Sequence, residues 1–167
     1  MNDHKEILAK GSINGSTPLC THLKNVADAA EIIAAHLGLD SAVARVGGLL
    51  HDIGKASPVF QQTLSSKFRP RPGCVFRHEI ASLFFTSLVE ECHRDEVIEM
   101  IVAHHKSIYH DVRELGLLDL YEYTECFLDH SKGFEAWSTT ALDILESLGM
   151  AVWPISIKEA EDNFNYA

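Results

Sequence analysis

The most informative stretch of the chain is residues 41–55, which read SAVARVGGLLHDIGK. The apolar residues of this stretch recur at helical spacing after Asp40, a residue type that caps helix N-termini, so we predict a buried helix that runs on to Gly54. His51 and Asp52 then lie in apolar surroundings. An unpaired carboxylate would cost several kcal/mol there, so Asp52 needs a partner, and a metal ion is one candidate.

The rest of the chain predicts more helices and no organising sheet. Thr21 is expected to cap a helix that ends at Gly38, and Pro58 to open a short one. Further helices are expected at residues 79–91, 95–106, 111–130, 134–148 and from 156 onward. Gly47 and Gly48 indicate close packing between helices. No segment shows sustained period-two alternation, so the predicted fold class is all-α, a single helical domain over residues 1–167 with a metal site between helices.

Composition limits the classes of function. The chain has 167 residues, 46% of them hydrophobic, enough for one domain with a real core. A net charge of −10 argues against binding of DNA by broad electrostatic attraction. Residues 1–18 form a polar lead without a secretory signal, and no apolar run reaches the roughly 20 residues that span a bilayer, so we expect a cytoplasmic protein with no membrane contact.

One local exception to the acidic charge is an Arg/Pro-rich loop at residues 65–75. Lys67, Arg69 and Arg71 lie in this loop and Arg77 follows it, with aromatic residues between them. A solvated loop is the plain interpretation. The alternative is that these cations guide a nucleic-acid strand.

The four cysteines are scattered and include no CxxC pair. Disulfide scaffolds and structural zinc sites use closer spacings, so we expect reduced and mostly buried thiols.

Ten histidines are unusual in a chain of this length, and five of them lie beside or within apolar helical faces: His22, His51, His78, His104 and His105. Each alone is more often structural, but together they predict a metal site. Imidazoles and a carboxylate without thiolates favour a borderline divalent ion such as iron, manganese, nickel, cobalt or zinc. Asp52 has two oxygens and could bridge two such ions, which would activate a water molecule as nucleophile.

Lys55 follows Asp52 by three residues, and a continued helical turn would bring its ammonium to the same face. There it could contact a phosphate oxygen or the leaving group. A lysine that interacts with the dipole of a helix C-terminus is the alternative interpretation.

In this order, the His/Asp residues resemble a known family. His22, His51-Asp52 with Lys55, His78-Glu79 and His104-His105 resemble the HD superfamily of metal-dependent phosphohydrolases. Residues 49–61, 77–79 and 101–105 resemble, more narrowly, the CRISPR-associated HD nuclease of type I systems. The similarity spans most of residues 19–106.

The resemblance implies a helical domain with two divalent metal ions. One ion would be held by His22, His51 and Asp52, and the other by Asp52, His78, His104 and His105. A late aspartate completes the first site in the family, and Asp162 is the best match by order. Lys106 departs from the family pattern, which more often has glycine after the paired histidines.

Members of this family cut single-stranded DNA that a helicase delivers after a guide-RNA surveillance complex has opened the target. The resemblance therefore implies an endonuclease or exonuclease of antiviral defence, with a helicase fused to it or separate. An HD phosphohydrolase of nucleotides or cyclic nucleotides is the rival enzyme, and an HD domain without catalysis that serves as an interaction module is the non-enzymatic alternative.

Overall fold

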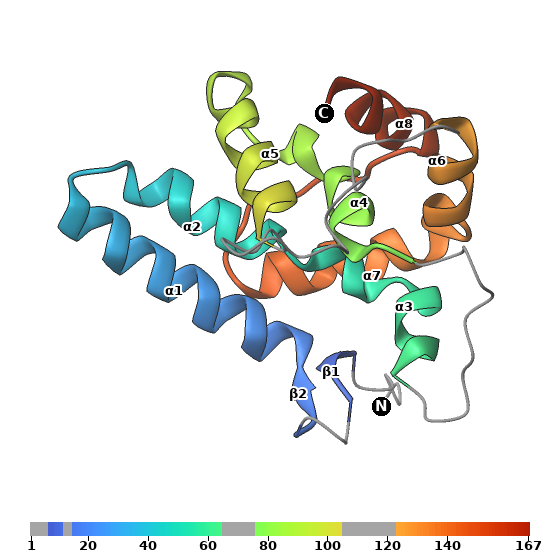
Figure 1. Ribbon diagram of the computed structural model, residues 1–167, viewed down its shortest axis with the longest axis horizontal. Helices are drawn as coiled ribbons and strands as arrows, with labels where there is room; N and C mark the ends of the chain where they lie inside the picture. The colour runs from blue at the N-terminus through green and yellow to red at the C-terminus, as the bar shows by residue number, and fades with distance from the viewer. Residues whose placement is uncertain (1–6, 12–14, 65–75, 105–122) are drawn as a thin grey trace, which may run out of the picture.

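The computed structural model describes residues 7–11, 15–64, 76–104 and 123–167, and within these ranges the protein is built of helices (Figure 1). This confirms the predicted all-α class. The α-helices are α1 (Leu19–Leu37), α2 (Ser41–Leu50), α3 (Pro58–Thr63), α4 (His78–Leu83), α5 (Arg94–Ala103), α6 (Tyr123–Ser131), α7 (Phe134–Ser147) and α8 (Ile157–Tyr166). Short 3₁₀ turns are η2 (Ile53–Ala56), η3 (Thr86–Leu88) and η4 (Glu91–His93), and strands β1 (Leu8–Lys10) and β2 (Thr17–Pro18) form a small antiparallel pair.

The sequence predicts the C-terminal end of the first helix correctly and its N-terminal end incorrectly. The end is as expected, because Gly38 has a φ of 71° and closes α1 in the left-handed conformation. The predicted Thr21 cap is wrong, since α1 already begins at Leu19. The backbone N–H of Leu19 donates to the carbonyl of Ile7 at 2.8 Å, so the N-terminal segment takes the place of a side-chain cap.

The second helix begins as predicted and ends earlier. The Asp40 carboxylate accepts hydrogen bonds from the backbone N–H groups of Ala42 and Val43 at 2.9 and 3.0 Å. The helix was expected to reach Gly54, but α2 stops at Leu50 and the chain continues as the 3₁₀ turn η2. In a 3₁₀ helix residues i and i+3 eclipse one another, so Lys55 lies directly over Asp52.

The remaining helices agree in type more than in length. The predicted helix 79–91 is wrong in extent, because α4 ends at Leu83 and 3₁₀ turns follow it. The helices expected at 58, 134–148 and after 156 are confirmed, with Ser57 and Ser156 as side-chain caps of α3 and α8. Residues 105–122, which include parts of two predicted helices, lie outside the described ranges.

Close helix packing around α2 is confirmed at both glycines. A Cβ atom on Gly48 would lie 2.7 Å from the Cα of Ala27 in α1, and one on Gly47 would lie 2.3 Å from the Sδ of Met100 in α5. At Gly48 the neighbouring atom is backbone, so no side chain fits there, whereas the flexible Met100 side chain could move aside for one at Gly47. Gly48 therefore allows α1 to approach the helix that leads to His51 and Asp52, and Gly47 lies against α5.

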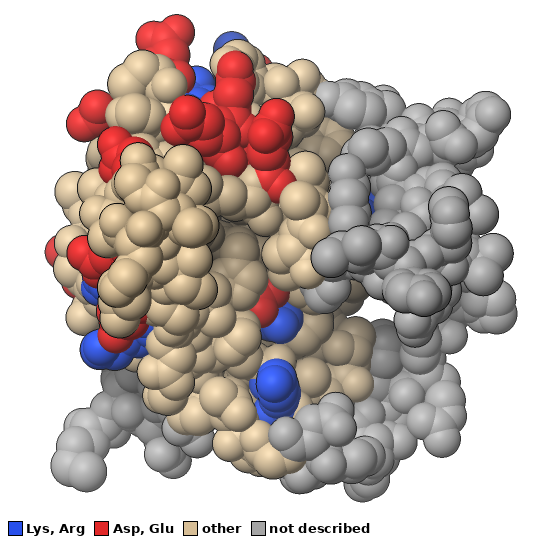
Figure 2. Space-filling model, turned by 60° about the vertical axis from the view of Figure 1, so that its left-hand side comes forward, with Lys and Arg blue, Asp and Glu red and all other residues tan. Residues whose placement is uncertain are grey.

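The surface of the protein tests the expectations about the cysteines and the charge. Cys20 and Cys92 are free and exposed, so the expectation of mostly buried thiols is wrong for these two. On the face shown in Figure 2, Asp and Glu side chains gather at one end, and few Lys or Arg lie among the residues that are described there. In the described ranges, no helix is both long and apolar enough to cross a membrane.

Candidate metal centre

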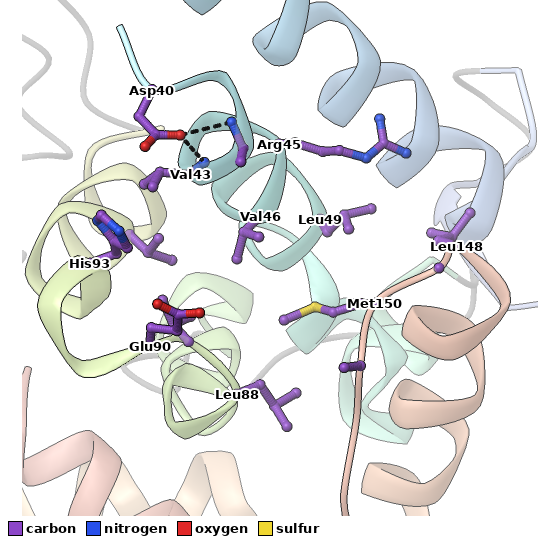
Figure 3. Close-up of a pocket in the computed structure, with 15 residues that line it drawn as sticks. Asp40, Val43, Arg45, Val46, Leu49, Leu88, Glu90, His93, Leu148 and Met150 are labelled. Atoms are coloured by element: carbon purple, nitrogen blue, oxygen red, sulfur yellow. Dashed lines mark hydrogen bonds between the residues drawn. The ribbon is translucent and has the colours of Figure 1, made fainter.

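One cavity in the protein is lined by none of the four predicted ligands His22, His51, His78 and His104. It has a volume of about 380 Å³ and lies between α2, η4, α5 and the segment that joins α7 to α8 (Figure 3). Apolar side chains such as Val46, Leu49 and Met150 line most of it, with Glu90 and His93 among the polar ones. The ligand atoms of Glu90, Cys92 and His93 lie within 4.8 Å of one another, and this exposed group is called the η4 group below.

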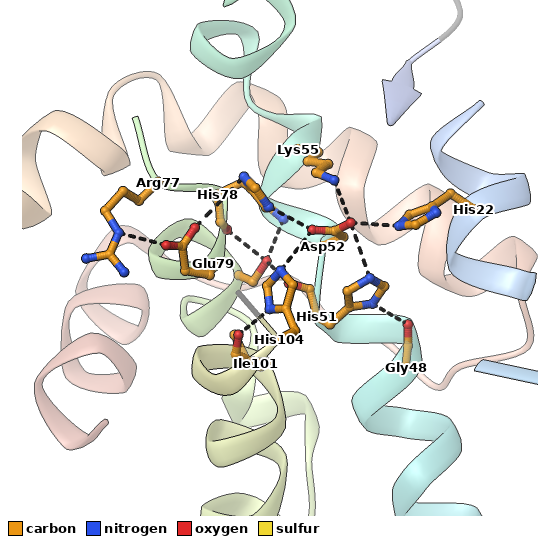
Figure 4. Close-up of polar contacts among 12 residues, drawn as sticks. His22, Gly48, His51, Asp52, Lys55, Arg77, His78, Glu79, Ile101 and His104 are labelled. Carbon is orange, nitrogen blue, oxygen red and sulfur yellow. Dashed lines mark hydrogen bonds and ion pairs between the residues drawn. The ribbon is translucent and has the colours of Figure 1, made fainter. Parts of the chain in front are cut away.

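A cluster of histidines forms around the buried Asp52, where four helical segments meet (Figure 4). His22 comes from α1, His51 and Asp52 from the end of α2, His78 from the start of α4 and His104 from the end of α5. The Nε2 atoms of His22 and His51 lie 2.7 and 3.2 Å from Oδ2 of Asp52. Those of His78 and His104 lie 2.9 and 3.3 Å from Oδ1. These residues are called the Asp52 cluster.

Packing of η2 against α4 brings Asp52 to His78. A Cβ atom on Gly54 would lie 2.1 Å from the carbonyl oxygen of His78, so only glycine permits this approach. The backbone N–H of Gly54 also donates to Oγ of Ser82 at 2.9 Å, and the Ser82 hydroxyl lies 2.9 Å from the same carbonyl of His78. Ser82 was not singled out from the sequence, where a serine inside an apolar helix gives no signal of this role.

Two of the rings are oriented by the backbone. The Nδ1 atom of His51 lies 2.8 Å from the carbonyl oxygen of Gly48, and Nδ1 of His104 contacts the carbonyl of Ile101. A carbonyl only accepts, so Nδ1 carries the hydrogen in both rings. The Nε2 atom of each ring is thereby directed at the Asp52 carboxylate, as an N–H donor when it carries a hydrogen and as a lone pair for a cation when it does not. Without that hydrogen, two acceptors face each other across 3.2 and 3.3 Å, and a metal cation between them would make the arrangement favourable.

The donor set fits divalent metal ions. Protons alone would make imidazolium rings of His51 and His104, because Nδ1 and Nε2 would then both donate, and would add them to the Lys55 ammonium around a single carboxylate, an excess of positive charge. Oδ1 of Asp52 is buried and has no hydrogen bond of normal geometry. The ligand atoms divide into two groups within 4.8 Å, one of His22, His51 and Asp52 and one of Asp52, His78 and His104. Imidazole nitrogens around a shared carboxylate suit borderline divalent ions.

Electrostatics keep Asp52 ionised. Burial, with 2% of the residue exposed, works to raise the pKa of Asp52. Contacts with the imidazoles of His104, His22, His51 and His78 outweigh burial and hold the pKa of this carboxyl far below its usual range. Nζ of Lys55 lies 2.6 Å from Oδ2 of Asp52, in agreement with the i, i+3 spacing of a 3₁₀ turn, and 5.6 Å from the centre of the Phe60 ring on α3.

A second buried carboxylate supports the start of α4. Oε1 of Glu79 accepts a hydrogen bond from Nε of Arg77 at 2.7 Å, and Oε2 lies 3.9 Å from Nδ1 of His78. Burial works to raise the pKa of Glu79, but its own backbone N–H, the Arg77 guanidinium and His78 lower it. The backbone N–H of Arg77 donates to Nε2 of the buried His130 at 2.8 Å. Arg77, predicted from the sequence to bind substrate, is thus also part of the protein's own framework.

Some predicted site residues do not join the cluster or cannot be placed. Asp162 lies on α8 with an exposed side chain, and α8 packs against α4, α6 and η3 instead of α1, which carries His22. His105, Lys67, Arg69 and Arg71 lie outside the described residues, as does Lys106.

The fold and the Asp52 cluster define the class of protein: a helical metal-dependent phosphohydrolase whose divalent metal site is built from imidazoles around one aspartate. The model of the HD domain family matches residues 19–134, and the chain belongs to this family.

One curated protein gives a more specific similarity than the family model does. The chain is 36% identical over 93 residues to the CRISPR-associated endonuclease Cas3-HD of Pyrococcus furiosus. The aligned region covers 52% of this chain and 37% of that protein, so the similarity spans little more than a third of the relative's length. No solved structure matches the chain.

Proposed function

We propose that this HD domain is a metal-dependent nuclease that hydrolyses phosphodiester bonds of single-stranded DNA in CRISPR interference. The observation that carries the proposal is the orientation of His51 and His104, whose Nε2 atoms are directed at one buried carboxylate while Nδ1 of each is held by a backbone carbonyl. The similarity over 93 residues to a protein named as a CRISPR-associated endonuclease supports the choice of a nuclease activity.

The residues of the Asp52 cluster would hold two divalent ions. His22, His51 and Asp52 would bind one ion, and Asp52, His78 and His104 the other, with His105 as a further ligand. Iron, manganese, nickel and cobalt are the candidate ions. Bound in this way, such ions lower the pKa of a water molecule and neutralise charge on phosphoryl oxygens. Asp162 is retained as a candidate ligand only on its order in the chain.

The protein itself contributes orientation and charge. Asp52 stays ionised at neutral pH, because the surrounding imidazoles lower its pKa, so it can serve both groups of ligands. Lys55 would leave Asp52 when metal ions occupy the oxygens and would then contact a phosphate oxygen or the leaving group. His22 and His104, with side chains 21% and 19% exposed, form the open side through which a strand would enter.

We further propose that other molecules hold most of the DNA. The acidic surface disfavours broad contact with a nucleic acid, so the domain would admit only a short single-stranded segment. A helicase, fused or separate, and a guide-RNA surveillance complex would deliver that segment. Lys67, Arg69, Arg71 and Arg77 would contact its phosphates.

A comparison of substrates tests the function. Purified protein is incubated with circular single-stranded DNA, nucleoside monophosphates or cyclic dinucleotides, each with manganese, nickel, cobalt or ferrous iron. We expect cleavage of the DNA circle, which also requires an internal cut. Hydrolysis of the nucleotides alone would overturn the nuclease proposal in favour of the nucleotide phosphohydrolase, and metal binding without any hydrolysis would favour the interaction module.

Reversal of charge tests the basic residues. Arg69→Glu with Arg71→Glu should weaken cleavage of DNA and leave the metal content unchanged, because phosphate contacts act on the substrate alone. Unchanged cleavage, measured under the same conditions, would remove these residues from the substrate path.

A further inference from the structure

Gln61, on α3, joins the N-terminal strand to the turn that carries Lys55. Its Oε1 accepts a hydrogen bond from the backbone N–H of Leu8 at 3.1 Å. Its Nε2 donates to the carbonyl of Leu8 at 2.8 Å and to the carbonyl of Lys55 at 2.7 Å. Both amide hydrogens and the amide oxygen are therefore used, across 53 residues of sequence.

A proline explains why the carbonyl of Lys55 needs this donor. In the 3₁₀ turn η2, each carbonyl accepts from the N–H three residues later: Asp52 accepts from Lys55, and Gly54 accepts from Ser57. The residue three after Lys55 is Pro58, which has no N–H. The Gln61 amide takes the place of the missing donor and fixes the end of the turn.

A second proline creates the same need on the strand. Pro18 lies opposite Leu8 in the antiparallel pair of β1 and β2 and cannot donate to the Leu8 carbonyl. Gln61 satisfies this carbonyl as well. The N-terminal segment is also bonded to the first helix. The carbonyl of Ile7, the residue before β1, accepts a hydrogen bond from the backbone N–H of Leu19 at the start of α1.

From these contacts we infer that Gln61 is a positioning residue for the reaction, which holds η2 so that the Lys55 ammonium stays beside the metal site, within reach of a substrate phosphate. The inference rests on the proposed function for its catalytic part. The hydrogen bonds of Gln61, called the clasp below, connect η2 to β1, and the N-terminal segment is bonded in turn to α1, which carries His22. His22 and Lys55 both contact Oδ2 of Asp52. The N-terminal strand therefore helps to fix the position of His22 relative to Lys55 at that oxygen.

The test compares Gln61→Met with Gln62→Met. Methionine keeps the length and apolar contacts of glutamine and loses its hydrogen bonds, and Gln62 is an exposed neighbour on the same helix. Lys55 is 9% exposed, so the intact protein should acetylate slowly there, with the 59%-exposed side chain of Lys24 as internal reference. Mass spectrometry of acetylated protein should show faster labelling of Lys55 in Gln61→Met and no change in Gln62→Met.

Turnover provides the second measurement. At saturating metal, Gln61→Met should lower kcat by about tenfold or more with little change in KM or in metal content, because misplacement acts on the reaction and not on binding. Gln61→Glu, which keeps the acceptor and loses both donors, should behave in the same way and serves if the methionine variant does not fold.

The possible outcomes separate this inference from the proposed function. Protection of Lys55 that is unchanged in a folded Gln61 variant would overturn the clasp. Faster labelling with unchanged kcat would overturn its part in the reaction. A wild-type protein that hydrolyses no substrate would contradict the proposed function, whereas the labelling experiment would still decide whether Gln61 holds Lys55.

Discussion

The Asp52 cluster and the η4 group bring similar side chains together by different means. In both, groups of three potential ligand atoms lie within 4.8 Å of one another. The η4 group consists of Glu90, Cys92 and His93, which are close because they are almost consecutive in the chain. The Asp52 cluster draws its members from four segments between residues 22 and 104. Only the tertiary fold can account for its proximity.

Burial separates the two regions further. Glu90 and Cys92 are exposed and can be hydrated, so the η4 group can remain without a cation at no cost. Asp52 is 2% exposed, and an unpaired carboxylate in such surroundings costs several kcal/mol. The comparison teaches that residue types and short distances do not define a metal centre on their own. Burial of the carboxylate and oriented imidazole nitrogens make the difference.

The largest expected effect comes from removal of the shared carboxylate. Asp52→Ala should lose bound metal from both ligand groups and lower phosphodiester hydrolysis by about a thousandfold or more, because several kcal/mol of stabilisation depend on the ions. Metal content measured by mass spectrometry, and turnover under the same conditions, check this. Glu90→Ala is the matched control and should change neither. Equal losses in the two variants would contradict the distinction between the regions.

A smaller effect is expected from removal of one imidazole. His78→Ala should lose the ion shared with His104 and keep the one held by His22 and His51, so the metal content per chain should fall by about half. Activity should fall by about a hundredfold or more, because loss even of a group that only orients a ligand costs 10- to 100-fold. His93→Ala, in the η4 group, should retain full metal content. Complete loss of metal in His78→Ala would indicate that the groups bind their ions together.

Sequence reasoning predicted the members of the Asp52 cluster better than the contacts that assemble it. His22, His51, His78 and His104 could be found because each lies beside or within the apolar face of a helix. Asp162 fitted the family order and yet lies exposed on α8, since order in a chain does not fix which helices pack together.

The local geometry of η2 could not be predicted in the same way. The helical pattern continues through His51, so the early end of α2 at Leu50 has no signal in hydrophobic spacing. It depends on the approach of α4 to Gly54, a tertiary contact. Pro58, three residues after Lys55, leaves the Lys55 carbonyl without a local donor once the turn is known to be 3₁₀, and the sequence did not show that Gln61 would supply one.

The smallest expected effect is the change in the free energy of unfolding when a carboxylate beside each region is replaced by an amide. Glu79 pairs with Arg77 and its side chain is 7% exposed, whereas Glu96 lies 3.4 Å from His93 and its side chain is 63% exposed. Glu79→Gln should lower the free energy of unfolding by about 1–2 kcal/mol at neutral pH, because a buried charged hydrogen bond becomes a neutral one. Glu96→Gln should change it by less than about 0.5 kcal/mol. Urea unfolding measures both.

The dependence on pH identifies the charge of Glu79 as the cause. Its pKa is lowered in the folded protein, so its contribution is fully present above the unfolded pKa of about 4.3 and is lost as pH falls through the folded value. The difference between wild type and Glu79→Gln should therefore be constant above about pH 5 and shrink below about pH 4. A difference that persists unchanged in acid would mean that shape, and not charge, makes Glu79 necessary at the start of the helix that carries His78.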